Sequence, residues 1–349
     1  IGDLNSFVGA NRLGAERLLS FMADYGMEDL RALAHVVQER SEKAMRQAIR
    51  AIPDGVYHST IQNNPLGEVL TYPVAVSVKG DEIEIDFEGA PPQLPRGGLN
   101  STLNYTAAHA TYPLKCMLTP AVRGNAGCYR PFSVKAPEGS ILNPKRPASV
   151  NIRTRTGWYI APNIFRALAK ASTDQVQAFT GLPVAANIYG QTPDGTIYSD
   201  LLFVGGGQGA SAQHDGKSGL LWPTSAANTS IELFETRVPV LVIEKAYLQD
   251  SGGAGEHRGG LGQRIRFRKL HDDKQITLVS VYPEGVGNPA EGLFGGHAGG
   301  EARGVVIDPN GAVLYDCGTG DLVNLNKPHE IVEIVIARRM KSFMIWPMA

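Results

Sequence analysis

The residues best suited by type to do chemistry lie in one glycine-rich stretch, LQDSGGAGEHRGGLGQ, at positions 248–263. Six glycines surround Asp250, His257 and Arg258 there. A carboxylate can orient an imidazole that transfers protons, and a guanidinium can stabilise a developing oxyanion. The stretch is either a structural loop whose glycines take positive φ, or a loop that presents these side chains to a ligand or a neighbouring subunit. The sequence leaves both interpretations open.

A second glycine-rich stretch, VGGGQGASAQHDGKSG at positions 204–219, resembles nucleotide-binding loops in part. Its G-x-G-x-x-A pattern is not followed by a helical period, as a dinucleotide fold requires. Six residues separate Gly209 from Gly216-Lys217-Ser218, too many for a P-loop to curl its amides round a phosphate. We therefore expect ATP, if used, to bind another chain, and we expect His214 and Asp215 to contact substrate.

Other catalytic patterns are missing from the sequence. No two of the eight histidines lie within four residues of each other, so no local motif places two imidazoles on one metal. The serines of both glycine-rich stretches lack the complete G-x-S-x-G form of a nucleophile elbow. We assign no metal ligand in this chain and predict no serine triad.

Composition narrows the class of protein. The 349 residues are 43% hydrophobic with a net charge of −1, which favours a globular enzyme over a partner of nucleic acid or of an acidic membrane. Three widely spaced cysteines indicate reduced thiols, and no signal peptide or membrane-length apolar run is present. We expect a soluble cytoplasmic protein.

The hydrophobic periods predict an α+β fold, with a helical N-terminal part packed on mixed β-sheets and a glycine-rich, β-dominated C-terminal half. We divide the body into residues 1–175 and 176–349. Leu30, Leu33, Val37, Ala44, Ala48 and Ile52 are expected to form the buried face of an early helix. The other expected elements are a hairpin at 74–87 turning at Lys79-Gly80-Asp81, a helix near 100–115 that Pro113 kinks or ends, a helix at 159–172, and strands at 196–204, 265–267, 276–282, 305–307, 313–315 and 331–336.

Three stretches together resemble a known family. DSGGAGEHRGGLG (250–262), IDFEGAPPQLPRGGLN (85–100) and the run from Tyr112 to Val150 are similar to signatures of the hydantoinase B/oxoprolinase family. That family includes B subunits of N-methylhydantoinases and α-type subunits of acetone and acetophenone carboxylases. The chain is therefore identified as a member, matching from about residue 1 to 325 in order along its length.

The resemblance implies a division of labour between subunits. An A-type partner subunit would bind ATP and phosphorylate the carbonyl oxygen of a small-molecule substrate, and the B-type subunit would present that substrate to water. Family members hold a divalent metal such as Zn, Mn or Fe through an N-terminal part that this chain, starting at Ile1, appears to lack. A glycine-rich ending is also expected where ARRMKSFMIWPMA stands. We expect a hetero-oligomer without a metal ligand in this chain.

For the chemistry itself we expect Asp250, His257, Arg258 and Arg130 to act in catalysis, and Asn100, His214 and Asp215 to bind substrate. The favoured reaction is ATP-dependent hydrolysis of a cyclic amide such as a hydantoin, oxoproline or lactam. ATP-dependent carboxylation of a ketone uses the same subunit plan and is one alternative. The other is a non-catalytic fragment whose glycine loops serve assembly.

Overall fold

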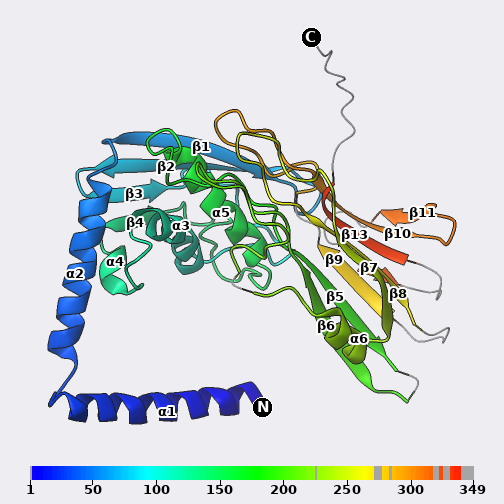
Figure 1. The fold of residues 1–349 in the computed structure, drawn as a ribbon, viewed down its shortest axis with the longest axis horizontal. Helices are drawn as coiled ribbons and strands as arrows, with labels where there is room; N and C mark the ends of the chain where they lie inside the picture. The colour runs from blue at the N-terminus through cyan, green and yellow to red at the C-terminus, as the bar shows by residue number, and fades with distance from the viewer. Residues whose placement is uncertain are drawn as a thin grey trace.

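The computed structural model describes residues 2–192, 194–224, 226–270, 277–282, 285–316, 322–324 and 331–338. Helices dominate its first part and strands its last part, so the predicted α+β class is confirmed (Figure 1). The cluster His271–Asp273 and residues 339–349 of the unusual C-terminal run lie outside the described ranges. Among the described residues, no helix combines the length and the apolar character needed to cross a membrane.

The helices are α1 (Gly2–Asp24), α2 (Arg31–Ile49), α3 (Leu103–Leu118), α4 (Ala126–Tyr129), α5 (Thr154–Leu168) and α6 (Ile231–Arg237). The strands are β1 (Gly55–Asn63), β2 (Leu70–Lys79), β3 (Glu82–Asp86), β4 (Phe132–Lys135), β5 (Val184–Gln191), β6 (Ile197–Val204), β7 (Val240–Tyr247), β8 (Gln263–Lys269), β9 (Thr277–Tyr282), β10 (Glu301–Ile307), β11 (Val313–Asp316), β12 (Leu322–Asn324) and β13 (Ile331–Arg338).

The two N-terminal helices extend from one end of the molecule (Figure 1). No residue of α1 is buried, and α2 buries only Ser41, Met45 and Ile49. The predicted buried face of α2 is therefore wrong in its first half, where Leu33 is 38% and Val37 44% exposed. Only the C-terminal half of α2 packs on the body, so an apolar period along the whole helix did not mark its true contact face.

The first sheet has the order β1-β2-β3-β4, with β4 parallel to β3 and the other pairs antiparallel. The predicted hairpin is confirmed: Val78 pairs with Ile83 on either side of Gly80, which has φ 64°. Every second residue of β2 is buried, which is the period that alternation of apolar and polar side chains predicts. The edge strand β1 was not predicted.

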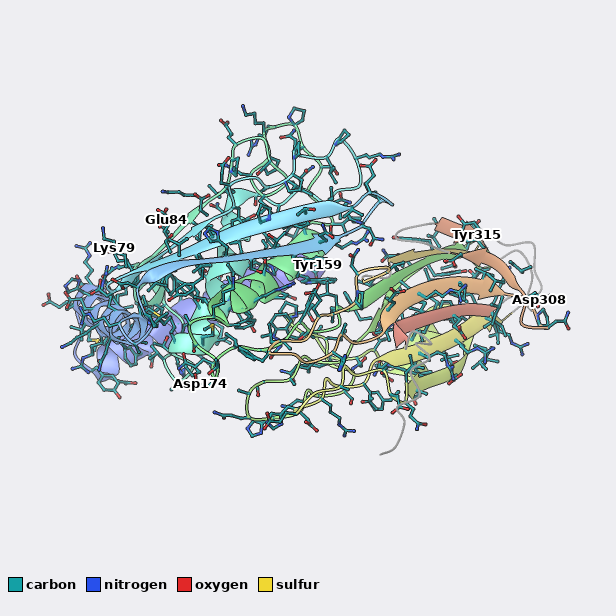
Figure 2. All side chains as sticks on the ribbon, turned by 90° about the horizontal axis from the view of Figure 1, so that it is seen from above. Lys79, Glu84, Tyr159, Asp174, Asp308 and Tyr315 are labelled. Atoms are coloured by element: carbon teal, nitrogen blue, oxygen red, sulfur yellow. The ribbon has the colours of Figure 1, made fainter. Side chains whose placement is uncertain are left out.

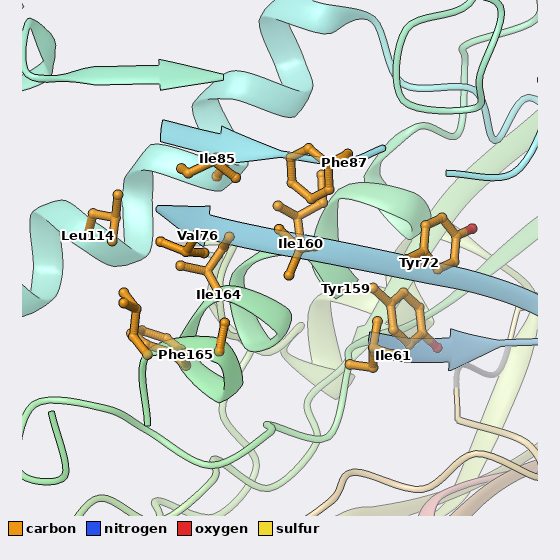
Figure 3. Packing of buried hydrophobic residues seen from close by; sticks show 14 of the residues in the cluster. Ile61, Tyr72, Val76, Ile85, Phe87, Leu114, Tyr159, Ile160, Ile164 and Phe165 are labelled. Carbon is orange, nitrogen blue, oxygen red and sulfur yellow. The ribbon is translucent and has the colours of Figure 1, made fainter. Parts of the chain in front are cut away.

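Helix α5 fills the concave side of this sheet. Its side chains meet those of β1, β2, β3 and α3 in one core, whose packing Figure 3 shows around Tyr159, Ile160 and Ile164. The helix runs from Thr154 to Leu168, about one turn earlier than predicted. The expectation that Pro113 ends its helix is wrong, since α3 continues to Leu118 with Pro113 buried inside it.

The C-terminal strands form two antiparallel sheets, β11-β10-β13-β8-β7 and β12-β9-β5-β6. They enclose a second core in which the rings of Phe234 and Phe267 meet edge to face at 6.4 Å. The first core ends in sequence at Leu182 and the second begins at Ala186. Glycine-rich loops join the two parts in the middle of the molecule (Figure 1).

Candidate functional site

The signature loop at 248–262 connects two neighbouring antiparallel strands, β7 and β8, as its position in the sequence predicts. It is far longer than a hairpin needs, and it folds back against two other loops. One of these is the second glycine-rich stretch at 205–219, which follows β6. The other is residues 285–300, which precede β10. The three loops and the segment 176–182 surround one cavity.

Backbone atoms of these loops touch one another directly. Gly260 N donates to Gln208 O at 2.9 Å, and Gln208 N donates to Lys217 O at 2.8 Å. A Cβ on Gly260 would lie 2.1 Å from Lys217 O, and one on Gly207 would lie 1.8 Å from Gly260 O. Glycine is thus required because main chains pack where side chains would normally stand.

This explanation corrects one expectation from the sequence. The structural reading of the signature loop attributed its glycines to positive φ, but none of them has a positive φ. The residue that does is Asp250, with φ 57° directly after β7. Asp tolerates the left-handed region better than most residues, so Asp250 serves the turn out of the strand.

The cavity enclosed by the loops has a volume of about 340 Å³. Its wall consists largely of glycine and alanine backbone, with Glu256 and His257 contributed by the signature loop. Tyr159 of α5 forms part of the floor and lies between the N-terminal body and the C-terminal sheets (Figure 2). A hollow of this size, near the lower end of the range for ligand pockets, suits a small molecule.

Asp215 joins two of the loops at the edge of this cavity. Its Oδ1 accepts from the backbone N–H of Arg258 at 3.0 Å and lies 3.7 Å from Nδ1 of His257, while its Oδ2 lies 3.2 Å from Nε of Arg258. The structure thus brings together three residues predicted for the site from segments more than forty positions apart. The other ring nitrogen of His257, Nε2, has no partner among the described residues.

Two further predicted site residues lie near the cavity without lining it. Asp250 is exposed at the start of the signature loop. His214 is exposed as well, and its backbone N–H and C=O pair with Ser211 in a tight turn. Both side chains face away from the described lining, so contact with a ligand in the cavity is not part of their geometry.

Arg130 stands apart from the cavity, at the end of α4. Its guanidinium donates to Glu42 Oε2 at 3.0 Å and to Gln38 Oε1 at 2.7 Å, both on α2. The charge of Arg130, together with that of Arg46, lowers the pKa of Glu42. These contacts join α4 to α2 and leave Arg130 outside the group of residues around the cavity.

Asn100 is fully buried, and its amide is used by the main chain. Its Oδ1 accepts from Leu94 N at 2.8 Å, and its Nδ2 donates to Leu94 O at 2.8 Å and to Ser149 O at 3.0 Å. The side chain holds the loop before α3 in place. The structure does not bring it to the cavity.

Several lining residues were missed by reasoning from the sequence. They include Tyr159, Glu291 and His297, which come from α5 and from the loop before β10. The paired glycines of GLFGGHAGGE at 292–301 resemble the signature loop in composition and were the one available signal. Nothing local connects Tyr159 with that loop, because the cavity forms only when distant segments meet.

Metal binding was tested on the donor atoms present. Among the residues that the structure describes, no group of three or more His, Cys, Asp or Glu side chains could hold a metal ion. The described residues therefore do not fit the divalent ion that the family resemblance implies.

The comparisons with known proteins agree on one family. The model of the family described as Hydantoinase B/oxoprolinase matches residues 1–336. Caprolactamase subunit beta of Pseudomonas jessenii is 31% identical, over 88% of this chain and 53% of its own length. The uncharacterized protein MJ0963 of Methanocaldococcus jannaschii is 29% identical, over 94% of this chain and 58% of its own. The chain thus spans about half the length of these curated relatives.

Solved structures show the same fold. The crystal structure of ATP-dependent caprolactamase from Pseudomonas jessenii has a TM-score of 0.81 and 27% identity, covering 96% of this chain and 60% of that one. A nucleotide-free acetone carboxylase structure has a TM-score of 0.72 and covers 85% of this chain and 46% of that one. Its identity of 15% shows likeness of fold alone.

Proposed function

Because this chain belongs to the hydantoinase B/oxoprolinase family, we propose that it forms part of an ATP-dependent enzyme that hydrolyses a cyclic amide. Its role is that of the B-type subunit, which receives a substrate phosphorylated on its carbonyl oxygen by an A-type partner. The observation that carries the proposal is the likeness to the caprolactamase, in sequence and over nearly the whole fold, together with a cavity of small-molecule size at the family's signature loop.

The proposed reaction uses the cavity to bring water to the activated carbon. The water oxygen bonds to that carbon and the C–N bond breaks, with a proton passing from the water to the departing nitrogen. The ring-opened acyl phosphate then reacts with a second water, which releases phosphate and leaves a carboxylate. An imidazole at the cavity wall can move such a proton, and we assign this role to His257.

Asp215 and Arg258 act on His257 by position. The carboxylate of Asp215 lies on the Nδ1 side of the imidazole and is itself held by the backbone and side chain of Arg258. This arrangement leaves Nε2 for the cavity, which is the geometry expected when a carboxylate orients a catalytic histidine. Asp250 is assigned to the turn that starts the loop.

The partner and cofactors of the whole enzyme follow the same proposal. ATP binds the A-type partner, in keeping with the failed nucleotide patterns in this chain, and the divalent ion is held outside the described residues. A cytoplasmic location is supported by the free thiols Cys116 and Cys128. Carboxylation of a ketone is the second candidate, and its support is the shared fold with acetone carboxylase.

Reconstitution tests this function. The chain, in its native-length context, is combined with its A-type partner and assayed for ATP-dependent ring opening of hydantoin, 5-oxoproline and caprolactam. Parallel assays supply acetone or acetophenone with bicarbonate. We expect ring opening of one cyclic amide coupled to phosphate release. Activity on the ketones alone would replace the hydrolase with the carboxylase, and assembly without either activity would favour the non-catalytic alternative.

A further inference from the structure

A second hollow lies on the N-terminal body, outside the glycine loops. It has a volume of about 350 Å³ and is lined by His58, Ser59 and Thr60 of β1 and by Arg166 and Lys170 at the C-terminal end of α5. We call this the β1–α5 niche. β1 is an edge strand of the first sheet, so the niche opens along an edge that no other strand of the sheet covers.

The niche presents hydrogen-bond donors almost exclusively. Lys170 Nζ donates to the backbone carbonyl of His58 at 3.1 Å, which holds the ammonium against the strand edge and leaves two of its three protons. Arg166 gives one nitrogen, Nη1, to Glu291 of the neighbouring loop. The described residues supply no partner to the rest of its planar fork, which suits an oxyanion.

An independent observation points to a ligand at the same place. The Oγ of Ser59 is buried and has no hydrogen-bond partner. Buried hydroxyls are nearly always paired in native structures, so an unpaired one on the wall of a hollow marks a missing hydrogen bond. The Thr60 hydroxyl lines the same hollow. Two cations and two hydroxyls thus approach one volume from both the strand and the helix.

We propose that the β1–α5 niche binds a phosphate-class oxyanion, either free inorganic phosphate or the phosphoryl end of a small molecule. A tetrahedral anion with about two charges at neutral pH can accept from Arg166, Lys170 and Ser59 at once, because its oxygens point in different directions. A planar carboxylate has two oxygens in one plane and satisfies fewer of these donors. The proposal stands independently of the reaction assigned to the glycine-loop cavity.

Arg166 connects this niche to that cavity. Its partner Glu291 also lines the cavity, and the backbone carbonyl of Glu291 accepts from Phe179 N at 3.2 Å. An anion in the niche competes with Glu291 for the guanidinium. Occupation of the niche is therefore expected to be sensed by the loop at 285–300.

Titration of the complete protein with inorganic phosphate at low ionic strength, followed by calorimetry, tests the niche. We expect saturable one-to-one binding in the millimolar range, typical of an exposed anion site. Lys170→Gln should weaken it by about tenfold or more and Ser59→Ala by several-fold, because each removes a hydrogen bond to a charged ligand. Lys79→Gln is the matched control, since Lys79 is an exposed lysine at the far end of the same sheet (Figure 2).

The outcomes separate the proposal from general charge attraction. Unchanged affinity in Lys79→Gln with loss in Lys170→Gln supports the niche, as does weaker binding of acetate than of phosphate. Equal losses in the two lysine variants, tighter binding of acetate, or no saturable heat would overturn it. Addition of a phosphorylated substrate in place of phosphate distinguishes the two sources, because only a phosphoryl compound would also contact residues beyond the niche.

Discussion

Substitution of Gly260 by alanine tests why the signature loop is rich in glycine. The added Cβ would lie 2.1 Å from Lys217 O, 2.5 Å from Lys217 C and 3.0 Å from Gln208 N. All three atoms are backbone, so the clash is relieved only by moving a loop and weakening the bond from Gly260 N to Gln208 O. Overpacking and one impaired hydrogen bond together cost about 2 to 4 kcal/mol.

Gly9→Ala is the matched control. Gly9 lies in α1, and a Cβ there would meet no atom within 4 Å. Alanine favours a helix over glycine by about 1 kcal/mol, and α1 buries none of its residues, so global stability should stay unchanged or rise slightly.

Urea unfolding followed by tryptophan fluorescence measures both variants. We expect a clearly lower midpoint for Gly260→Ala than for the wild type, and an unchanged midpoint for Gly9→Ala. If Gly260→Ala unfolds like the wild type, the loops do not pack through their main chains as described, and the glycines need another explanation.

Three further predictions concern single side chains. Burial lowers the pKa of His109 from 6.5 to about 4; the unfolded chain therefore binds the proton first, and up to about 3 kcal/mol of stability present at neutral pH is lost as the pH falls through this window. His109→Gln should flatten that loss in urea unfolding at several pH values, and an unchanged slope would refute it. Arg130→Met should cost at most about 1 kcal/mol in unfolding and leave turnover unchanged, whereas a large fall in turnover at full stability would support the catalytic role predicted from the sequence. Ser230→Ala removes the N-cap of α6, whose Oγ accepts from Leu233 N, and should cost about 1 kcal/mol; an unaltered melting temperature would contradict this.

Much of the fold follows from local patterns. Strict alternation in β2 and β3 predicts their hairpin because one face of the sheet is buried and the other exposed. β1 lacks this signal, since only its last residues, Ile61 and Asn63, are buried. The contact face of α2 could not be read either, because its first half has apolar side chains that remain exposed.

The candidate site was only partly predictable. The signature loop and the Asp215 segment stand out by composition, and the structure places His257 and Arg258 beside Asp215. Arg130 carries the right charge, yet its partners on α2 can be known only from the folded chain. The requirement for glycine at Gly260 is likewise non-local, because the blocking atom belongs to Lys217.

The most direct test of the central claim compares His257→Gln with His35→Gln in the reconstituted complex. His35 is an exposed histidine of α2 that pairs with Glu39 and lies away from the cavity. We predict that His257→Gln lowers kcat for ATP-dependent ring opening by about a hundredfold or more, typical of losing a positioned acid–base group, with unchanged assembly and unfolding midpoint. His35→Gln should match the wild type. Full turnover by His257→Gln would contradict the assignment of the glycine-loop cavity as the place of reaction.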